Sequence, residues 1–183
     1  FYREISSLVD VRVPNAVFGE VAEDGVDFIL LLEDLCPARG GDQLTGCGIE
    51  DARHAVRQAA ALHAPSWDNP EVLDRDWLRP APEIRERLAA LYPSAQAIFR
   101  ERYADVLEPE LLAICEGFSS EIEAWYGRQP SQRSLVHGDF RLDNMLFDIA
   151  AGAEPLAVVD WQTVNVGSGL DDLGYFLGCG LGS

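Results

Sequence analysis

Two apolar runs near the start of the chain are separated by a short polar turn. The runs Ala16 to Val21 and Val26 to Leu32 enclose Ala22-Glu23-Asp24-Gly25, and this pattern predicts a β-hairpin. The nine residues FYREISSLV at the start of the chain resemble the end of a helix. After the second run, Glu33 to Leu35 leaves the strand, and the proline and glycines between positions 37 and 41 predict irregular backbone.

Apolar positions at helical spacing fill the middle region from Ile49 to Tyr126. One face contains Ala52, Val56, Ala59 and His63, and a later face contains Leu111, Cys115, Phe118, Ile122 and Trp125. Between the two faces we expect a loop from Pro65 to Pro82, then a helical stretch from Glu83 to Val106 that is interrupted near Pro93. His63 is expected to be a hydrogen-bonded core residue rather than a ligand.

A second hairpin is predicted toward the end of the chain. Met145 to Phe147 is apolar, Asp148 to Glu154 is turn-like, and Leu156 to Val159 is apolar again. This hairpin would return Asp160 to the side of Asn144. Ser168, followed three residues later by Asp171, predicts the start of a helix from Gly169 to Leu177. Short strands beside a helical majority predict an α+β fold.

The composition is typical of a soluble enzyme. The chain has 183 residues, of which 48% are hydrophobic, so it can bury a core of ordinary size for one domain. There is no signal peptide or long apolar run, and we expect a cytoplasmic protein without membrane contacts. The four cysteines are widely spaced and are expected to be free thiols.

The formal net charge of −17 argues against a nucleic-acid partner, because phosphate backbones require clustered lysine and arginine on the binding face. Two interpretations of the acidic surface remain open. It could attract cationic substrates, or it could serve solubility alone. The sequence carries no signal for an oligomeric state.

The strongest chemical signal is HGDFRLDN, which is followed by the Asp160 of AVVDWQ. Phosphoryl transfer needs a carboxylate that holds the acceptor hydroxyl, and oxygen ligands for the Mg²⁺ that bridges the phosphates. Asp139 and Asn144 match the base and metal-ligand positions of a kinase catalytic loop, and Asp160 fits a second metal ligand. Arg141 could steady the transferred phosphate or form an ion pair, and Asp143 could assist the metal or cap the turn.

These motifs also carry a family resemblance. The segments LVHGDFRLDNMLF and VVDWQTVNVGSGLDDLGYF resemble the aminoglycoside phosphotransferase and choline kinase-like enzymes, which share the protein kinase architecture. The segment LLLEDL, from Leu30 to Leu35, is similar to the hinge that connects the two lobes in this family. Within the family, DWQ and LEDL resemble the bacterial relatives of the ecdysteroid kinase-like group.

The resemblance implies a protein kinase-like two-lobe fold. Residues 1–35 would be the remnant of the N-terminal lobe with the hinge, and residues 36–183 a mainly helical C-terminal lobe that is truncated at its end. Asp139 would be the catalytic base, and Asn144 and Asp160 would bind Mg²⁺. The backbone at Glu33 and Leu35 would bind the adenine of ATP. His137 and Asp172 would support the site structurally.

The function expected is an ATP- and Mg²⁺-dependent phosphotransferase that acts on a hydroxyl of a small molecule, such as an aminoglycoside or a choline-like metabolite. Trp161 and Gln162 stand where protein kinases have Phe-Gly, which favours a small-molecule acceptor over a protein. A nucleotide-binding pseudokinase or regulatory module is the alternative. A metal-dependent phosphohydrolase is disfavoured because the chain has only three histidines.

The chain contains no lysine, since all fourteen basic residues counted as Lys or Arg are arginines. Kinases of this type use a lysine and a glycine-rich loop to hold the phosphates. Both are therefore expected outside this sequence. The chain begins at Phe1 and stops soon after its last predicted helix, so we expect both ends of a larger protein to be missing. This chain alone is expected to be weak or inactive.

Overall fold

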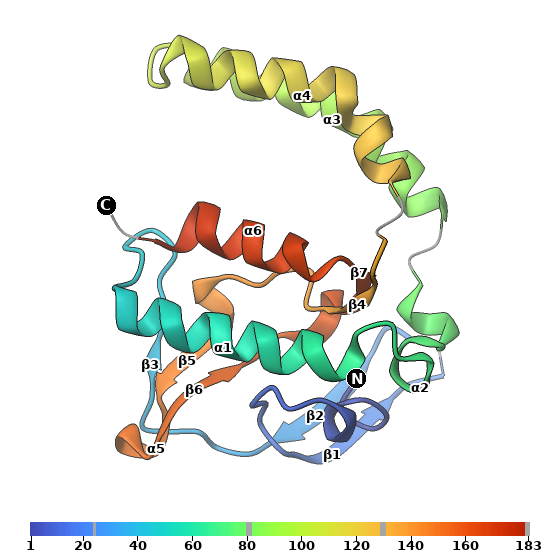
Figure 1. Ribbon diagram of the computed structural model, residues 1–183, viewed down its shortest axis with the longest axis vertical. Coiled ribbons are helices and arrows are strands. Elements are labelled where there is room, and N and C mark those ends of the chain that lie inside the picture. Colours follow the sequence, from blue (N-terminus) through green and yellow to red (C-terminus); the bar gives the residue numbers. More distant parts are fainter. Residues whose placement is uncertain (24, 80–81, 129–130, 182–183) are drawn as a thin grey trace. The chain divides into compact units, whose positions relative to one another are not determined.

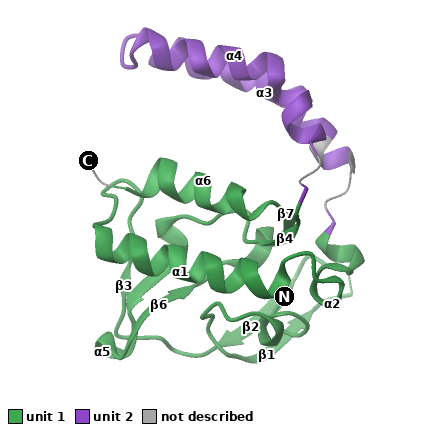
Figure 2. Ribbon diagram, in the orientation of Figure 1, with its two compact units in different colours: residues 1–78, 132–183 green, residues 79–131 purple. Residues whose placement is uncertain are grey.

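The computed structural model describes residues 1–23, 25–79, 82–128 and 131–181. They form two compact units, one made of residues 1–78 and 132–183 and the other of residues 79–131 (Figure 2). The sequence-based division at residue 35 does not coincide with the boundaries of these units, and it stays a prediction.

The strands of the first unit form three small antiparallel sheets (Figure 1). Strand β1 (Ala16–Val21) pairs with β2 (Phe28–Leu32); β3 (Arg39–Gly40), β5 (Met145–Asp148) and β6 (Glu154–Val158) pair in that order; and β4 (Ser134–Val136) pairs with β7 (Asn165–Gly167). Both predicted hairpins are confirmed, although Asp24 in the first turn lies outside the described residues.

Two long helices and several short ones complete this unit. They are η1 (Ser6–Leu8), α1 (Ile49–Ser66), α2 (Pro70–Leu73), η2 (Asp76–Leu78), η3 (Leu142–Asn144), α5 (Ile149–Gly152), η4 (Trp161–Thr163) and α6 (Gly169–Gly180). Helix α1 packs against α6 and against strands β4 and β6 (Figure 1). The core between them contains Leu62, Leu135, Phe140, Leu142, Met145, Phe147 and Phe176. This core therefore lies directly beneath the loop that follows β4.

The predicted loop from Pro65 to Pro82 is wrong in part, and residues 80 and 81 lie outside the described residues. Helix α1 continues through Pro65 to Ser66, and the short helices α2 and η2 follow. Proline cannot donate to the carbonyl four residues earlier, which in α1 belongs to Ala61. That carbonyl instead accepts a hydrogen bond from the backbone N–H of Asp10, at 3.0 Å. Because a residue far away in the sequence satisfies this carbonyl, the proline does not end the helix.

Two further local predictions were wrong. Helix α3 (Pro82–Tyr103) is not interrupted at Pro93, whose side chain is on the exposed side, where water can satisfy the freed carbonyl. The segment FYREISSLV forms a 3₁₀ turn at Ser6–Leu8 rather than the end of a helix. There, Ile5 is fully buried and the ring of Phe1 stacks on Trp161, with ring centroids 4.0 Å apart.

The second unit is a helical hairpin in which α3 packs against α4 (Pro109–Gly127). The rings of Tyr92 and Phe118 meet edge-on with centroids 5.3 Å apart, and those of Phe118 and Trp125 with centroids 5.6 Å apart. The apolar face predicted for α4 is only partly buried. Ile122 is 3% exposed but Leu111 is 49% exposed, because one partner helix covers only a narrow stripe.

Directly after the second unit, the chain returns to the first unit and is hydrogen-bonded there to residue Asp68. The N–H of Asp68 donates to the carbonyl of Arg133 at 2.7 Å, and the N–H of Arg133 donates to the Asp68 carboxylate at 2.9 Å. Within the described part of the chain, no helix combines the length and apolar character needed to cross a membrane.

Candidate active site

The segment from His137 to Asn144 forms a tight loop between β4 and β5. Gly138 has a φ of +81°, and a Cβ at this position would lie 2.6 Å from the carbonyl oxygen of Thr163, so only glycine fits here. Along the loop, buried and accessible side chains alternate. Phe140 and Leu142 are fully buried in the core, whereas Asp139 and Arg141 are partly exposed. Apolar anchors thus hold the backbone while the charged side chains stay accessible.

Asp139 and Asn144 are joined directly. The Nδ2 of Asn144 donates to the backbone oxygen of Asp139 at 2.8 Å and to its carboxylate Oδ2 at 2.9 Å. Arg141 donates from Nε to the same Oδ2 at 3.1 Å. Within the described residues, no hydrogen bond reaches the Oδ1 of Asn144. The amide therefore fixes the candidate base through its nitrogen and keeps its oxygen for another ligand.

The charge of Asp139 acts on two neighbouring groups. It is the main reason that the pKa of Arg141 is raised above its ordinary value. The pKa of Tyr175, on α6, is raised first by burial and next by the charge of Asp139. Of the alternatives open for Arg141, the structure contains the ion pair, because its Nη1 also lies 3.2 Å from Asp143 Oδ2. The Oδ1 of Asp143 accepts a hydrogen bond from the N–H of Gln43 at 3.0 Å.

Asp160 lies at the end of the second strand of the hairpin. The N–H of Val159 donates to the carbonyl of Asn144 at 3.0 Å, which places Asp160 one residue beyond a direct contact with Asn144. Asp160 is exposed and has a left-handed backbone, with a φ of 64°. Non-glycine residues with such dihedrals are uncommon and concentrate at functional sites.

The side-chain oxygen atoms of this site are suitable ligands for Mg²⁺. This ion prefers hard oxygen ligands and usually keeps several waters while using one or two protein side chains together with substrate phosphates. The free amide oxygen of Asn144 and the exposed carboxylate of Asp160 are such ligands. No cluster of three or more His, Cys, Asp or Glu side chains suited to a metal exists in the part of the chain that the structure describes.

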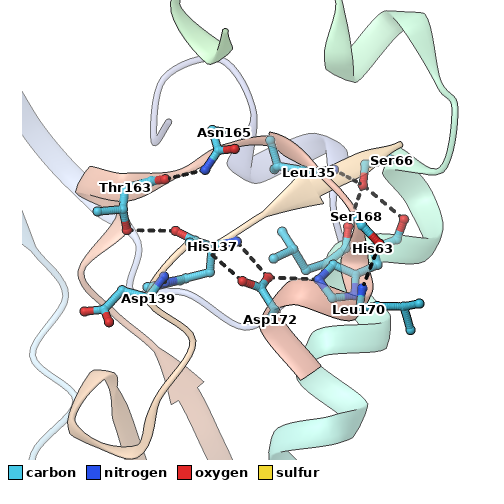
Figure 3. Close-up of polar contacts among 12 residues, drawn as sticks. His63, Ser66, Leu135, His137, Asp139, Thr163, Asn165, Ser168, Leu170 and Asp172 are labelled. Carbon is cyan, nitrogen blue, oxygen red and sulfur yellow. Dashed lines mark hydrogen bonds and ion pairs between the residues drawn. The ribbon is translucent and has the colours of Figure 1, made fainter. Parts of the chain in front are cut away.

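His137 and Asp172 both hold the backbone of the loop (Figure 3). The buried carboxylate of Asp172 accepts from the N–H of His137 at 2.8 Å and from the N–H of Gly138 at 3.0 Å. The Nε2 of His137 lies 2.9 Å from the carbonyl oxygen of Val159, next to Asp160. These contacts link the loop that contains Asp139 to the hairpin end that contains Asp160.

The two candidate hinge residues differ in their surroundings. The carboxylate of Glu33 accepts hydrogen bonds from Arg12 at 2.9 and 3.1 Å, while Leu35 is buried. Arg12 also pairs with Glu154 at 2.7 Å, so it joins the hinge to the first residue of β6. The backbone N–H of Leu35 and carbonyl of Glu33 have no hydrogen bond within the described residues.

The expectation that His63 is a hydrogen-bonded core residue is confirmed, and its Nε2 lies 3.0 Å from Asp172 Oδ2. Two other residues of the site were missed from the sequence, namely Arg12 at the candidate hinge and Tyr175 beside Asp139. Only Tyr175 had a signal in the sequence, since it lies in the DDLGYF motif one helical turn after Asp172.

Comparison with known proteins matches residues 7–180 to a family described as the phosphotransferase enzyme family. The chain belongs to this family. The chain is similar to several solved structures. One is a GDP complex of a point mutant of aminoglycoside 2'-phosphotransferase-IIIa, with a TM-score of 0.57 and 17% identity. The similarity covers 95% of this chain and 57% of that one. A type VIII aminoglycoside-3'-phosphotransferase gives a TM-score of 0.50 and 20% identity, over 94% of this chain and 62% of that one.

The expected α+β, protein kinase-like fold and the resemblance to aminoglycoside phosphotransferases are thereby confirmed. The nearness to the ecdysteroid kinase-like group stays a prediction. Among curated proteins, acyl-CoA dehydrogenase family member 11 of Homo sapiens is 41% identical over 46 residues, which are 25% of this chain and 6% of that protein. Family member 10 of Mus musculus is 50% identical over 42 residues, or 23% of this chain and 4% of that protein. The match to this chain thus spans only a small part of the length of these relatives.

Proposed function

We propose that this chain contributes the acceptor-orienting and metal-binding residues of a kinase that transfers the γ-phosphoryl group of ATP to a hydroxyl of a small molecule. The observation that carries the proposal is the junction of Asp139 with Asn144, next to the hairpin end that contains Asp160. A base candidate and two oxygen ligands from separate segments are what phosphoryl transfer requires.

In the proposed reaction Asp139 accepts a hydrogen bond from the acceptor hydroxyl and takes its proton. A bond forms between the acceptor oxygen and the γ-phosphorus, and the bond from that phosphorus to the bridging oxygen breaks, so that ADP leaves. Mg²⁺, held by Asn144 and Asp160, would neutralise the phosphate charge when bound. Asn144 and Arg141 orient the carboxylate of Asp139 before the substrate arrives.

The nucleotide would lie against the hinge. The open carbonyl of Glu33 and N–H of Leu35 support this position, and Arg12 would keep the hinge in place through both carboxylates. One of the similar solved structures is a GDP complex, so both ATP and GTP are included in the test below. A small acceptor is proposed because the family resemblance is to enzymes named for aminoglycosides, and the net charge of −17 suits a cationic acceptor.

The test uses the full-length protein that contains this chain, with Mg²⁺ and ATP or GTP. A panel of aminoglycosides, choline-like amines, sugars and sterols is incubated with it and examined by mass spectrometry. We expect one member to gain a single phosphoryl group. Nucleotide binding without transfer to any member would instead favour the nucleotide-binding pseudokinase.

The role of Asp139 is tested with the acceptor so found. Asp139→Asn should lower kcat by roughly 10²- to 10⁴-fold, the usual contribution of a general base, and leave nucleotide affinity unchanged. Asp148→Asn is the matched control, because Asp148 is an exposed carboxylate at the end of β5, the strand that follows the loop of Asp139. An equal loss of turnover and nucleotide affinity in Asp139→Asn would make Asp139 a structural residue.

A further inference from the structure

Residues 41–47 lie between β3 and α1 and pack against the loop that contains Asp139 (Figure 1). The N–H of Gly41 donates to the carbonyl of Met145 at 2.9 Å. A Cβ added to Gly41 would lie only 2.2 Å from the carbonyl oxygen of Leu142, so only glycine lets the two backbones approach so closely. Residues 41–47 are called the connecting segment below.

Hydrogen bonds hold the rest of the connecting segment in one conformation. The carboxylate of Asp42 accepts from the N–H of Leu44 at 2.9 Å and from the hydroxyl of Thr45 at 2.6 Å. At the far end, the N–H of Cys47 donates to the carbonyl of Gly180, at the end of α6, at 2.8 Å. The backbone amides between these points therefore have fixed directions.

The side chain of Asp143 bridges the connecting segment and Arg141. Its Oδ1 accepts from the N–H of Gln43 at 3.0 Å, and its Oδ2 lies 3.2 Å from Nη1 of Arg141. The Nε of the same guanidinium donates to Asp139 Oδ2 at 3.1 Å. A guanidinium is planar and rigid, so a partner that fixes Nη1 also fixes the direction of Nε. Asp143 and Asp139 thus hold two corners of one rigid group.

We propose that Asp143 is a positioning residue, which holds the guanidinium of Arg141 in the orientation from which Nε donates to Asp139. The inference rests on the proposed function in one respect, namely that Asp139 orients the acceptor. Asp143 touches no reacting atom. It acts through Arg141, and the N–H of Gln43 gives its carboxylate a fixed reference point.

A single partner would hold Arg141 poorly. Its side chain is 35% exposed, so water competes for each donor, and an arginine loses much rotamer freedom when it is fixed in one geometry. The pKa of Arg141 is raised above its ordinary value chiefly by Asp139 and further by Asp143, so both carboxylates favour the charged form. What Asp143 adds to this exposed pair is direction rather than stability.

The experiment is a double-mutant cycle in the full-length protein that contains this chain. It compares Asp143→Ala, Arg141→Met and the double variant with the natural protein. Asp143→Ala should lower kcat by about three- to tenfold, with the KM for nucleotide within about twofold. In the Arg141→Met background the same change should lower kcat by less than about twofold, because a residue that acts through Arg141 has no effect without it.

Asp51→Ala is the matched control for this cycle. Asp51 also pairs with an arginine, at 3.0 Å from Nη2 of Arg39, but Arg39 has no printed contact with Asp139. We therefore expect Asp51→Ala to leave kcat within about twofold of each background. Urea unfolding verifies that all variants are folded.

A second variant, Asp143→Asn, keeps the shape of the side chain. Its single amide oxygen should stay with the fixed N–H of Gln43, which leaves an N–H₂ group facing the guanidinium of Arg141. Asp143→Asn should therefore lower kcat as Asp143→Ala does, and it serves in the cycle if the alanine variant does not fold.

A further readout needs no substrate. Hydrogen exchange at the side-chain Nε–H of Arg141, followed by NMR, reports its bond to Asp139. We expect this exchange to accelerate by about fivefold or more in both Asp143 variants, and to stay within about twofold of the natural rate in Asp51→Ala. A merely structural role of Asp143 would leave the exchange unchanged in folded variants.

Equal losses of kcat in the two backgrounds, with natural exchange at Arg141 Nε–H, would overturn the proposal. If the Mg²⁺ requirement also rose in Asp143→Ala but not in Arg141→Met, Asp143 would be a metal ligand instead. If the natural protein phosphorylates nothing, the proposed function fails, and the exchange at Arg141 Nε–H alone decides whether Asp143 positions this side chain.

Discussion

Arg141 and Asp139 form an ion pair within the loop between β4 and β5, with Nε 3.1 Å from Oδ2. The two side chains are 35% and 27% exposed, so water screens the pair while its geometry still orients the carboxylate. The contact therefore matters more for the position of Asp139 than for the stability of the fold.

Arg141→Met should leave the free energy of unfolding close to that of the natural protein, because water screens this pair. It should lower kcat by about tenfold, because Asp139 loses one of the two donors to Oδ2. Urea unfolding and steady-state kinetics measure both effects. Arg53→Met, which removes an exposed pair with Glu50, is the control and should change neither. A loss of several kcal/mol on Arg141→Met would contradict this division.

Asp160→Gly should separate stability from activity. The left-handed backbone at φ 64° is unfavourable for aspartate but accessible to glycine, which offsets the entropy that glycine loses on folding. We expect the free energy of unfolding to stay within about 1 kcal/mol of the natural value while Mg²⁺-dependent transfer is abolished. Denaturant titration and the transfer assay measure the two. Undiminished transfer would remove Asp160 from the metal site.

Gly138→Ala should destabilise the fold by more than about 2 kcal/mol, because the new methyl group meets the carbonyl of Thr163 in a backbone conformation that alanine resists. Gly174→Ala in α6 is the matched control. A Cβ there meets nothing within 4 Å, and alanine in a helix should add about 0.5–1 kcal/mol of stability. Comparison of unfolding midpoints tests both, and equal effects would show that the conformation of Gly138 is not restrictive.

The pair of carboxylates at Arg12 predicts a stability change in acid. Hydrogen bonds from Arg12 lower the pKa values of Glu33 and Glu154 below the ordinary glutamate value of 4.5. A lowered folded-state pKa gives stability that is present above the unfolded value and is lost as the pH falls through the folded value. The natural protein should therefore lose stability as the pH falls below about 4.5, and Arg12→Met should lose less over that range.

Urea midpoints measured at neutral pH and at several pH values below 4.5 make this comparison. Arg53→Met is again the control, since the exposed pair of Arg53 with Glu50 should leave the pH profile close to that of the natural protein. Parallel profiles for the natural protein and Arg12→Met would contradict the assigned linkage.

The loop from His137 to Asn144 and both hairpins could be predicted because their residues are close in the sequence and carry strong local patterns. Asp139 and Asn144 are five residues apart, and the hairpin that leads to Asp160 is marked by two apolar runs around a turn. Their roles in catalysis stay predictions.

The contacts that hold the site could not be predicted. Arg12 and Glu154 are 142 residues apart, and His63 and Asp172 are 109 apart, so no periodicity in a single sequence links them. The same limit applied to the buried face of α1. Val56 was expected on that face but is 39% exposed, because the positions of α6, β4 and β6 decide which arc is covered.

The double hydrogen bond between Asp68 and Arg133 has a consequence for how such a protein can change over time. It joins two residues of the first unit that come before and after residues 79–131 in the sequence. This segment is therefore an insertion between two connected positions of the first unit. Lengthening a flexible connection costs only about 0.6 kcal/mol for each doubling. Natural variation can therefore exchange or extend residues 79–131 while the candidate site on the other unit is unchanged.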